Sequence, residues 1–127
     1  MLVSVLKSKL HRACVTDADL HYEGSLTLSP HLIDLCGILP YERVLVSNMS
    51  NGERFETYVI VGKKSGPEVC LNGATAHLGK IGDRLTIMTF GLMEIEKARK
   101  HKPVAILLDE HNKPVRSSDQ AEARAGE

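Results

Sequence analysis

The sequence contains no tryptophan, and aromatic residues make up only 4% of its 127 residues. A core built from this composition must be mainly aliphatic. The formal net charge is zero, with 16 basic and 16 acidic residues. Because a nucleic-acid-binding surface normally needs an excess of basic side chains, this balance argues against that class of function. No apolar run approaches the length of a membrane span, so we also expect no membrane partner.

Cysteine is scarce and scattered. The three cysteines are Cys14, Cys36 and Cys70, and none of them forms a CxxC pair. An odd and dispersed set argues against a disulfide framework and favours a reducing compartment. The first residues also lack the long apolar stretch of a signal peptide. We therefore expect a cytoplasmic protein.

Short segments rich in β-branched residues recur along the chain and predict a mainly β fold. The expected strands cover residues 2–6, 9–16, 43–48, 54–61, 68–71, 84–90 and 103–108. The expected helices are short, at 30–36 between the capping residues Ser29 and Gly37, at 74–78, and at 92–101. This pattern indicates a small barrel or sandwich. We expect one domain over residues 1–115 and a polar, disordered tail over 116–127.

The dipeptide Gly24-Ser25 can do chemistry on its own backbone. A serine hydroxyl can attack the carbonyl carbon of the preceding residue and convert that amide into an ester. Glycine at the preceding position removes the Cβ that would hinder the attack. Elimination from the ester gives dehydroalanine, which hydrolyses to a pyruvoyl group at a new N-terminus. Most Gly-Ser pairs are turns, so the dipeptide alone leaves both interpretations open.

Two of the expected strands carry side chains that suit an acidic substrate. Alternation places Arg54 and Tyr58 on one face of their strand and Thr57 on the other. A guanidinium matches a carboxylate bidentately, and a phenol held close to a carbon can protonate it. Lys9 and His11 also share a strand face, where one can supply positive charge and the other can move protons. Each of these residues has an ordinary alternative as a solvated or hydrogen-bonded strand side chain.

Metal and phosphate sites are not expected. His11 and Cys14 are possible ligand types, but a regular strand directs them to opposite faces and no second ligand pair follows. The run Gly62-Lys63-Lys64-Ser65-Gly66 is typical of a hairpin loop rather than of a phosphate cradle. We therefore expect no metal and no pyridoxal phosphate.

Several motifs, taken together and in order, resemble the aspartate 1-decarboxylase family of pyruvoyl-dependent enzymes. The likeness begins with Lys9-Leu10-His11-Arg12 and the segment from Val15 to Ser25. It continues in the order Gly37-Ile38-Leu39, Asn51-Gly52, Arg54-Phe55, Thr57-Tyr58, Asn72-Gly73-Ala74, Ala76-His77 and Gly82-Asp83. It fades after Arg99.

The resemblance implies a six-stranded double-psi β-barrel that assembles as a homotetramer. It implies self-cleavage into residues 1–24 and 25–127, with Ser25 converted into a covalently bound pyruvoyl group. The ketone of this group would form a Schiff base with the substrate amine and act as the electron sink for loss of CO2. The implied substrate is L-aspartate, and the implied product, β-alanine, feeds pantothenate synthesis.

The resemblance also implies roles for individual residues. Tyr58 would donate a proton to the product carbon, and Thr57 would help self-cleavage near the oxyanion that forms on Gly24. The implied substrate-binding residues are Lys9, His11, Arg54, Thr57, Asn72, Gly73, Ala74 and Thr75. Asn72-Gly73 is also a strong hairpin signal, so a purely structural role stays open. The family usually has alanine at position 75, so Thr75 would alter substrate binding if its side chain points into the pocket.

Two other functions remain open. Arg54 favours an acidic substrate but does not separate aspartate from glutamate or cysteine sulfinate, because one methylene changes binding by only about 1–3 kcal/mol. The chain could then be a pyruvoyl-dependent decarboxylase of another acidic amino acid. It could also be a non-catalytic barrel that keeps the fold and binds an acidic metabolite.

Overall fold

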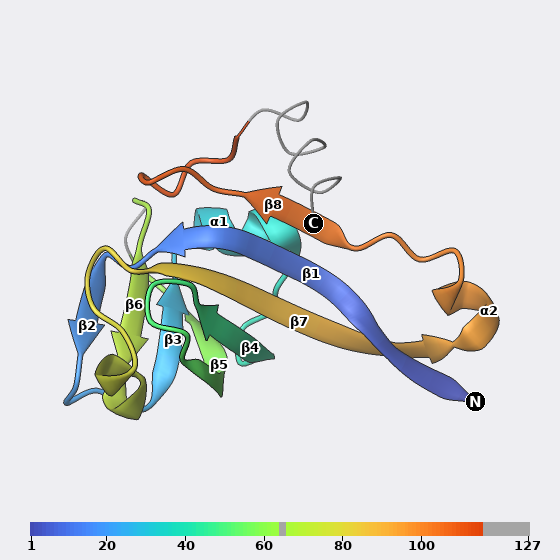
Figure 1. The fold of residues 1–127 in the computed structure, drawn as a ribbon, viewed down its shortest axis with the longest axis horizontal. Coiled ribbons are helices and arrows are strands. Elements are labelled where there is room, and N and C mark those ends of the chain that lie inside the picture. The colour runs from blue at the N-terminus through green and yellow to red at the C-terminus, as the bar shows by residue number, and fades with distance from the viewer. Residues whose placement is uncertain (64–65, 116–127) are drawn as a thin grey trace.

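The computed structural model describes residues 1–63 and 66–115, which form one connected β-sheet with short helices (Figure 1). The strands follow the spatial order β2-β6-β3-β5-β4-β7-β1-β8. Their bounds are β1 Leu2–Cys14, β2 Asp17–Asp19, β3 Ser25–Leu28, β4 Arg43–Asn48, β5 Arg54–Val61, β6 Val69–Asn72, β7 Arg84–Glu94 and β8 Val104–Leu107. The helices in these residues are α1 Pro30–Cys36, the 3₁₀ helix η1 Gly73–His77 and α2 Ile95–Ala98.

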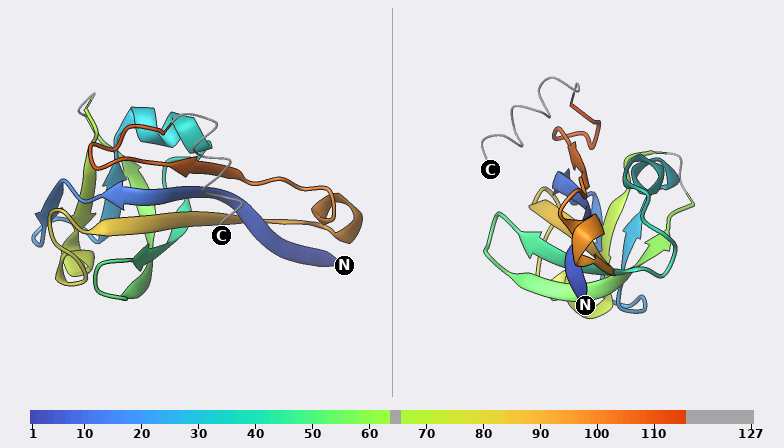
Figure 2. Two further views of the ribbon diagram at one scale, coloured as in Figure 1. Left: turned by 45° about the horizontal axis from the view of Figure 1, so that its top comes forward. Right: turned by 90° about the vertical axis from the view of Figure 1, so that its right-hand side faces the viewer.

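The chain itself closes the sheet into a small barrel. β2 follows β1 after only two residues, yet β2 lies at one end of the spatial order and β1 near the other. At this crossing the Thr16 amide donates to the Val69 carbonyl of β6, 2.8 Å away. The six strands between the short strands β2 and β8 agree in number with the expected barrel. The prediction of a mainly β fold with a few short helices is confirmed, and Figure 2 shows it from two further sides.

The core is aliphatic, as the composition requires. The fully buried leucines and valines come from every side of the barrel, among them Leu10, Leu26, Leu28, Val46, Val59, Leu71 and Leu85. Burying each such side chain stabilises the fold by roughly 1.5–3 kcal/mol. Leu10 is buried between the half-buried Lys9 and His11, so the predicted alternation along this part of β1 is confirmed.

The helix expected at 92–101 is largely wrong. Residues up to Glu94 belong to β7, because the first residues of β1 offer a partner and Leu2 pairs with Glu94. Pairing between strands therefore overrides the local helical pattern, and only Ile95–Ala98 is helical. The strands at 2–6 and 9–16 are also one strand with two irregularities, one of them at Arg12, where φ is +67°.

Helix α1 begins and ends where the sequence indicates. The Ser29 hydroxyl accepts a hydrogen bond from the Leu32 amide, and Pro30 occupies the first turn. Gly37 adopts the left-handed conformation with φ +70° and ends the helix. This short helix follows β3 directly in the chain.

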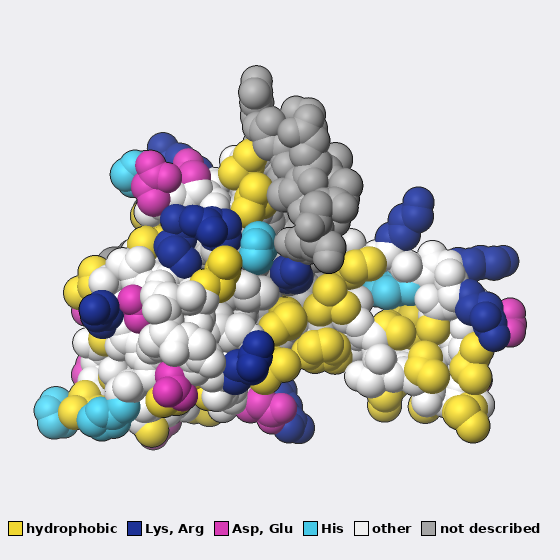
Figure 3. Space-filling view, viewed as in Figure 1, with side chains coloured by type: hydrophobic (Ala, Val, Ile, Leu, Met, Phe, Trp, Pro, Cys, Tyr) yellow, Lys and Arg dark blue, Asp and Glu magenta, His cyan; other side chains and the backbone are white. Residues whose placement is uncertain are grey.

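Strands β1 and β7 extend beyond the rest of the sheet as a two-stranded arm that carries α2 at its tip (Figure 1). Hydrophobic side chains gather on this arm in the space-filling view (Figure 3). Exposed examples are Leu2, Phe90 and Leu92, of which Leu92 is 69% exposed. Among the described residues, no helix has the length and apolar character needed to cross a membrane. The tail expected over 116–127 lies outside the described residues.

Candidate functional site

Ser25 is the first residue of β3 and lies between two neighbouring strands. On one side it pairs with Asn72 of β6 in antiparallel register. On the other side Leu26 pairs with Val59 of β5 in parallel register, so Tyr58 is the β5 residue that comes beside Ser25. Neighbouring strands are about 4.8 Å apart, and this places the three residues in one row across the sheet. Ser25 is fully buried in this row.

The hydroxyl of Ser25 donates one hydrogen bond and accepts another. It donates to the backbone carbonyl of Glu23 over 3.0 Å. It accepts from Asn72 Nδ2 over 3.0 Å, and the same nitrogen donates to Thr27 Oγ1 over 2.7 Å. The side chain of Ser25 therefore points back toward the segment that precedes it, which is the direction an attack on Gly24 requires.

The two glycines near this segment, Gly24 and Gly73, differ in how closely their surroundings are packed. A Cβ added to Gly24 would meet no heavy atom within 4 Å, so packing does not demand glycine there. A Cβ added to Gly73 would lie 2.7 Å from the Cα and N of Gly24 and 2.9 Å from the Tyr22 carbonyl oxygen. Gly73 also has φ +63° and begins η1 rather than a hairpin. Glycine at position 73 thus lets the loop before Ser25 pack directly on the backbone of η1.

Thr75 points into this cluster. Its side chain is buried, and its hydroxyl donates to the Asn72 carbonyl oxygen over 2.7 Å. The same hydroxyl lies 3.4 Å from the carbonyl oxygen of Ser25. Ala74 is exposed. The Thr75 hydroxyl therefore contacts the backbone carbonyls of both Ser25 and Asn72.

Thr57 and Tyr58 reach the site from β5, where both are half-buried. Tyr58 pairs with Arg43 of β4, and its ring centroid is 6.4 Å from that of Tyr41. Thr57 precedes Tyr58 on β5, one position beyond the residue that comes beside Ser25.

Three of the predicted residues lie elsewhere on the chain. Arg54 is exposed at the start of β5, four residues or about 13 Å along the strand from Tyr58. Lys9 and His11 are on β1, which pairs with β7 and β8 and not with β3, β5 or β6. The His11 ring contacts the Thr86 hydroxyl of β7 over 3.2 Å. Hence the sheet of one chain groups Ser25 with Thr57, Tyr58, Asn72, Gly73 and Thr75, and not with these three residues.

The sequence-based prediction missed Thr27 and Cys70. Thr27 receives a hydrogen bond from Asn72, and the Cys70 thiol donates to Asn72 Oδ1 over 3.2 Å. Both lie two residues from a predicted site residue on the same strand, so they share its face. This spacing was the available signal. The strand Ser25–Leu28, which carries Thr27, is too short for its periodicity to be recognised in the sequence.

Burial and charge keep Cys70 in its thiol form. Burial raises the pKa of the Cys70 thiol to about 11, and the Asp17, Glu68 and Asp19 carboxylates act in the same direction. The thiol therefore carries its proton at neutral pH and can donate it in a hydrogen bond. No cluster of three or more His, Cys, Asp or Glu side chains suited to a metal occurs within residues 1–63 and 66–115.

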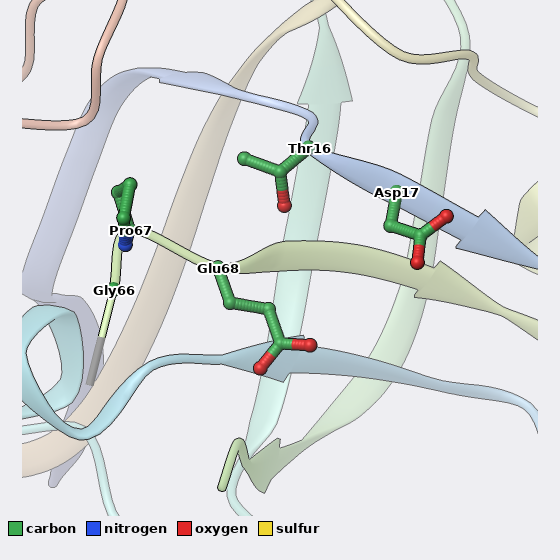
Figure 4. A pocket seen from close by; sticks show the side chains of 5 residues that line it. All are labelled: Thr16, Asp17, Gly66, Pro67 and Glu68. Atoms are coloured by element: carbon green, nitrogen blue, oxygen red, sulfur yellow. The ribbon is translucent and has the colours of Figure 1, made fainter. Parts of the chain in front are cut away.

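Two hollows open beside β6. One of about 340 Å³ reaches the Ser25 cluster through Thr27, Cys70 and Asn72. The other, of about 230 Å³, lies near the start of β6 and is lined by Thr16, Asp17, Gly66, Pro67 and Glu68 (Figure 4). Asp17 and Glu68 line both hollows, so their charge does not distinguish the two, and only the first hollow is also lined by residues of the Ser25 cluster.

Comparison with known proteins gives this geometry a family. Residues 1–115 match the model of the aspartate decarboxylase family. The chain is 49% identical to the aspartate 1-decarboxylase of Caldicellulosiruptor bescii over 96% of this chain and 95% of the relative. It is 51% identical to the aspartate 1-decarboxylase of Chlorobium chlorochromatii over 90% of this chain and 88% of the relative. The chain therefore belongs to the aspartate decarboxylase family.

Proposed function

We propose that this protein cleaves itself between Gly24 and Ser25 and then converts L-aspartate to β-alanine and CO2. The observation that carries the proposal is the environment of Ser25. Its hydroxyl is fully buried, accepts a hydrogen bond from Asn72 and donates back to the Glu23 carbonyl. A serine that was only part of a turn would not need a buried amide donor from another strand.

The chain's own residues account for the cleavage step. Ser25 Oγ attacks the Gly24 carbonyl carbon, the bond from that carbon to the Ser25 nitrogen breaks, and the hydroxyl proton ends on the nitrogen. A donor close to the oxyanion lowers the barrier, and Thr57, which precedes Tyr58 on β5, is the proposed donor. Loss of the Ser25 α-proton then expels the Gly24 carboxylate and leaves dehydroalanine. This enamine takes up a proton at its β-carbon to become an imine, and water hydrolyses the imine to the ketone with release of ammonia.

The new N-terminus would lie in the row between Tyr58 and Asn72. The pyruvoyl ketone supplies the electron sink that decarboxylation of an α-amino acid needs. Tyr58, whose strand position is beside residue 25, is the proposed proton donor to the product carbon. Asn72, Gly73, Ala74 and Thr75 are the proposed contacts for the substrate on the β6 and η1 side. A buried site of this kind also limits water near the reacting carbon.

We propose that the working form is a homotetramer, in which another copy brings Lys9, His11 and Arg54 to the site. Two observations support this. Those three residues lie away from Ser25 in the sheet of one chain, and the β1–β7 arm exposes Leu2, Phe90 and Leu92. An exposed apolar surface of this kind is typical of a contact between subunits. Light scattering at several protein concentrations tests the assembly.

The product would enter pantothenate synthesis, and the expected compartment is the cytoplasm. The cysteines Cys14, Cys36 and Cys70 are all free thiols, which suits a reducing compartment. Arg54 supports an acidic substrate, and the names of the relatives favour aspartate. Competition among aspartate, glutamate and cysteine sulfinate tests this choice.

Intact mass of the purified protein is the decisive experiment. We expect one fragment that ends at Gly24 and a second that begins with a pyruvoyl group, together with release of CO2 from L-aspartate. Ser25→Ala should remain one chain without activity, while the exposed control Ser4→Ala should cleave normally. A wild-type chain that stays intact and releases no CO2 would instead support the non-catalytic barrel.

A further inference from the structure

Both the nitrogen and the oxygen of the Asn72 side-chain amide form hydrogen bonds. Its nitrogen donates to the hydroxyls of Ser25 and Thr27, over 3.0 and 2.7 Å. Its oxygen accepts from the thiol of Cys70, over 3.2 Å. Asn72 is only 3% exposed, so water has little access to replace any of these partners. The Cys70 contact is therefore part of the arrangement that holds the amide beside Ser25.

The fold gives Cys70 this position. Cys70 and Asn72 are two residues apart on β6 and so project to the same face. In the antiparallel pairing with β3, Cys70 is opposite Thr27 and Asn72 is opposite Ser25. The four side chains thus form two rungs on one face of the sheet. Cys70 is 6% exposed.

An asparagine amide can occupy two orientations that differ by a flip of its oxygen and nitrogen. In the flipped orientation the oxygen would face the hydroxyls of Ser25 and Thr27, and the NH2 group would face sulfur. Sulfur is a weak acceptor, while a protonated thiol is a donor. Because the pKa of Cys70 is raised to about 11, the thiol keeps its proton at neutral pH and favours the oxygen as its neighbour.

The orientation matters for the direction of the Ser25 hydroxyl. With nitrogen facing Ser25, the hydroxyl accepts from Asn72 and its own proton points to the Glu23 carbonyl. With oxygen facing Ser25, Asn72 would compete for that proton and draw the hydroxyl toward β6. The hydroxyl proton would then point toward β6, and Asn72 would no longer donate to the oxygen that must attack.

We propose that Cys70 is a positioning residue for self-cleavage, and that its thiol fixes the Asn72 amide with the nitrogen toward Ser25. This assignment rests on the cleavage proposed above. Cys70 takes no part in the bond changes of the acyl shift and acts only through Asn72. Removal of the thiol should therefore slow cleavage without abolishing it.

The test compares cleavage rates of freshly synthesised chains, followed by intact mass, with melting temperatures measured in parallel. Cys70→Ala and Cys70→Val lack a donor, and each should slow cleavage about two- to tenfold, the range that one modest hydrogen bond supplies. Cys70→Ser keeps a donor and should restore the rate to within about twofold of wild type. The matched control is Cys36→Ala, since Cys36 is equally buried but donates to Leu32 within α1.

The outcomes separate the two proposals. Slow cleavage in the Ala and Val variants, with rescue by serine and a normal rate in Cys36→Ala, supports the assignment. Wild-type rates in both donorless variants overturn it, and so does a serine variant that is as slow as alanine. Equal slowing in Cys36→Ala would show a general effect of core truncation and would also overturn it. A wild-type chain that never cleaves would contradict the proposed function and, with it, this role of Cys70.

Discussion

Gly73 packs directly against Gly24, so closely that a Cβ on Gly73 would be 2.7 Å from the Gly24 Cα. The two residues are far apart in the sequence but in contact in the fold. Gly24 itself has open space around its Cβ position. The steric demand for glycine therefore lies at position 73, and the site depends on a glycine outside the bond that is proposed to break.

Gly73→Ala should slow self-cleavage by roughly tenfold or more, because small misplacements of reacting groups cost large factors in rate. The added Cβ displaces the loop that carries Gly24. Gly37→Ala is the matched control, because Gly37 has a similar φ of +70° but no neighbour within 4 Å of its Cβ position. Both changes should cost about 1–2 kcal/mol of stability through the left-handed backbone. Equal cleavage rates in the two variants, measured by intact mass, would contradict the steric explanation.

Tyr58→Phe should still cleave but lose most turnover. The phenol lies in the position beside residue 25 for proton delivery, and loss of a general acid typically lowers kcat by about 10²- to 10⁴-fold. Steady-state release of CO2, measured on fully cleaved enzyme, checks this. Tyr41→Phe is the control, since the Tyr41 ring is near that of Tyr58 but its side chain is exposed. Full activity in Tyr58→Phe would remove the residue from this role.

Arg54→Ala should mainly raise KM for aspartate, by about 10- to 100-fold, because a hydrogen bond to a charged group is worth roughly 1.5–3 kcal/mol. Cleavage should be normal, since Arg54 lies away from Ser25 in the sheet. Arg43→Ala tests for a general effect of charge, as Arg43 is also exposed and forms an ion pair with Glu56. If both variants changed KM alike, the effect would be one of overall charge rather than of substrate binding.

Stability should fall at alkaline pH through Cys36. Burial raises the pKa of this thiol from 9.0 to about 11. Between these values the unfolded chain loses the proton and the folded chain keeps it, so the free energy of unfolding decreases as pH rises from about 9 to 11. Denaturant unfolding across this range should show a shallower decrease in Cys36→Ala than in wild type. Identical slopes would show that Cys36 does not cause the effect.

The sequence predicted most of the strands and the helix α1, because strand alternation and helix caps are local patterns. Ser29 and Gly37 show this for α1, and Leu10 between Lys9 and His11 shows it for β1. It did not predict β3 or the extension of β7 to Glu94. The first is a short strand buried on both faces, and the second exists only because the start of β1 pairs with it. Both depend on partners that are distant in the sequence.

By itself, the sequence determined the mainly β fold, the Gly24-Ser25 pair and the set of side chains that the family resemblance connects to it. Only the tertiary structure decided that Ser25 lies between Tyr58 and Asn72, that Gly73 supports Gly24, and that Cys70 contacts Asn72. The physical reason is that residue types and alternation are properties of one segment. The pairing register of two strands arises only when separate strands are brought together. The same holds for a contact between two backbones and for the hydrogen-bond partner of a buried amide.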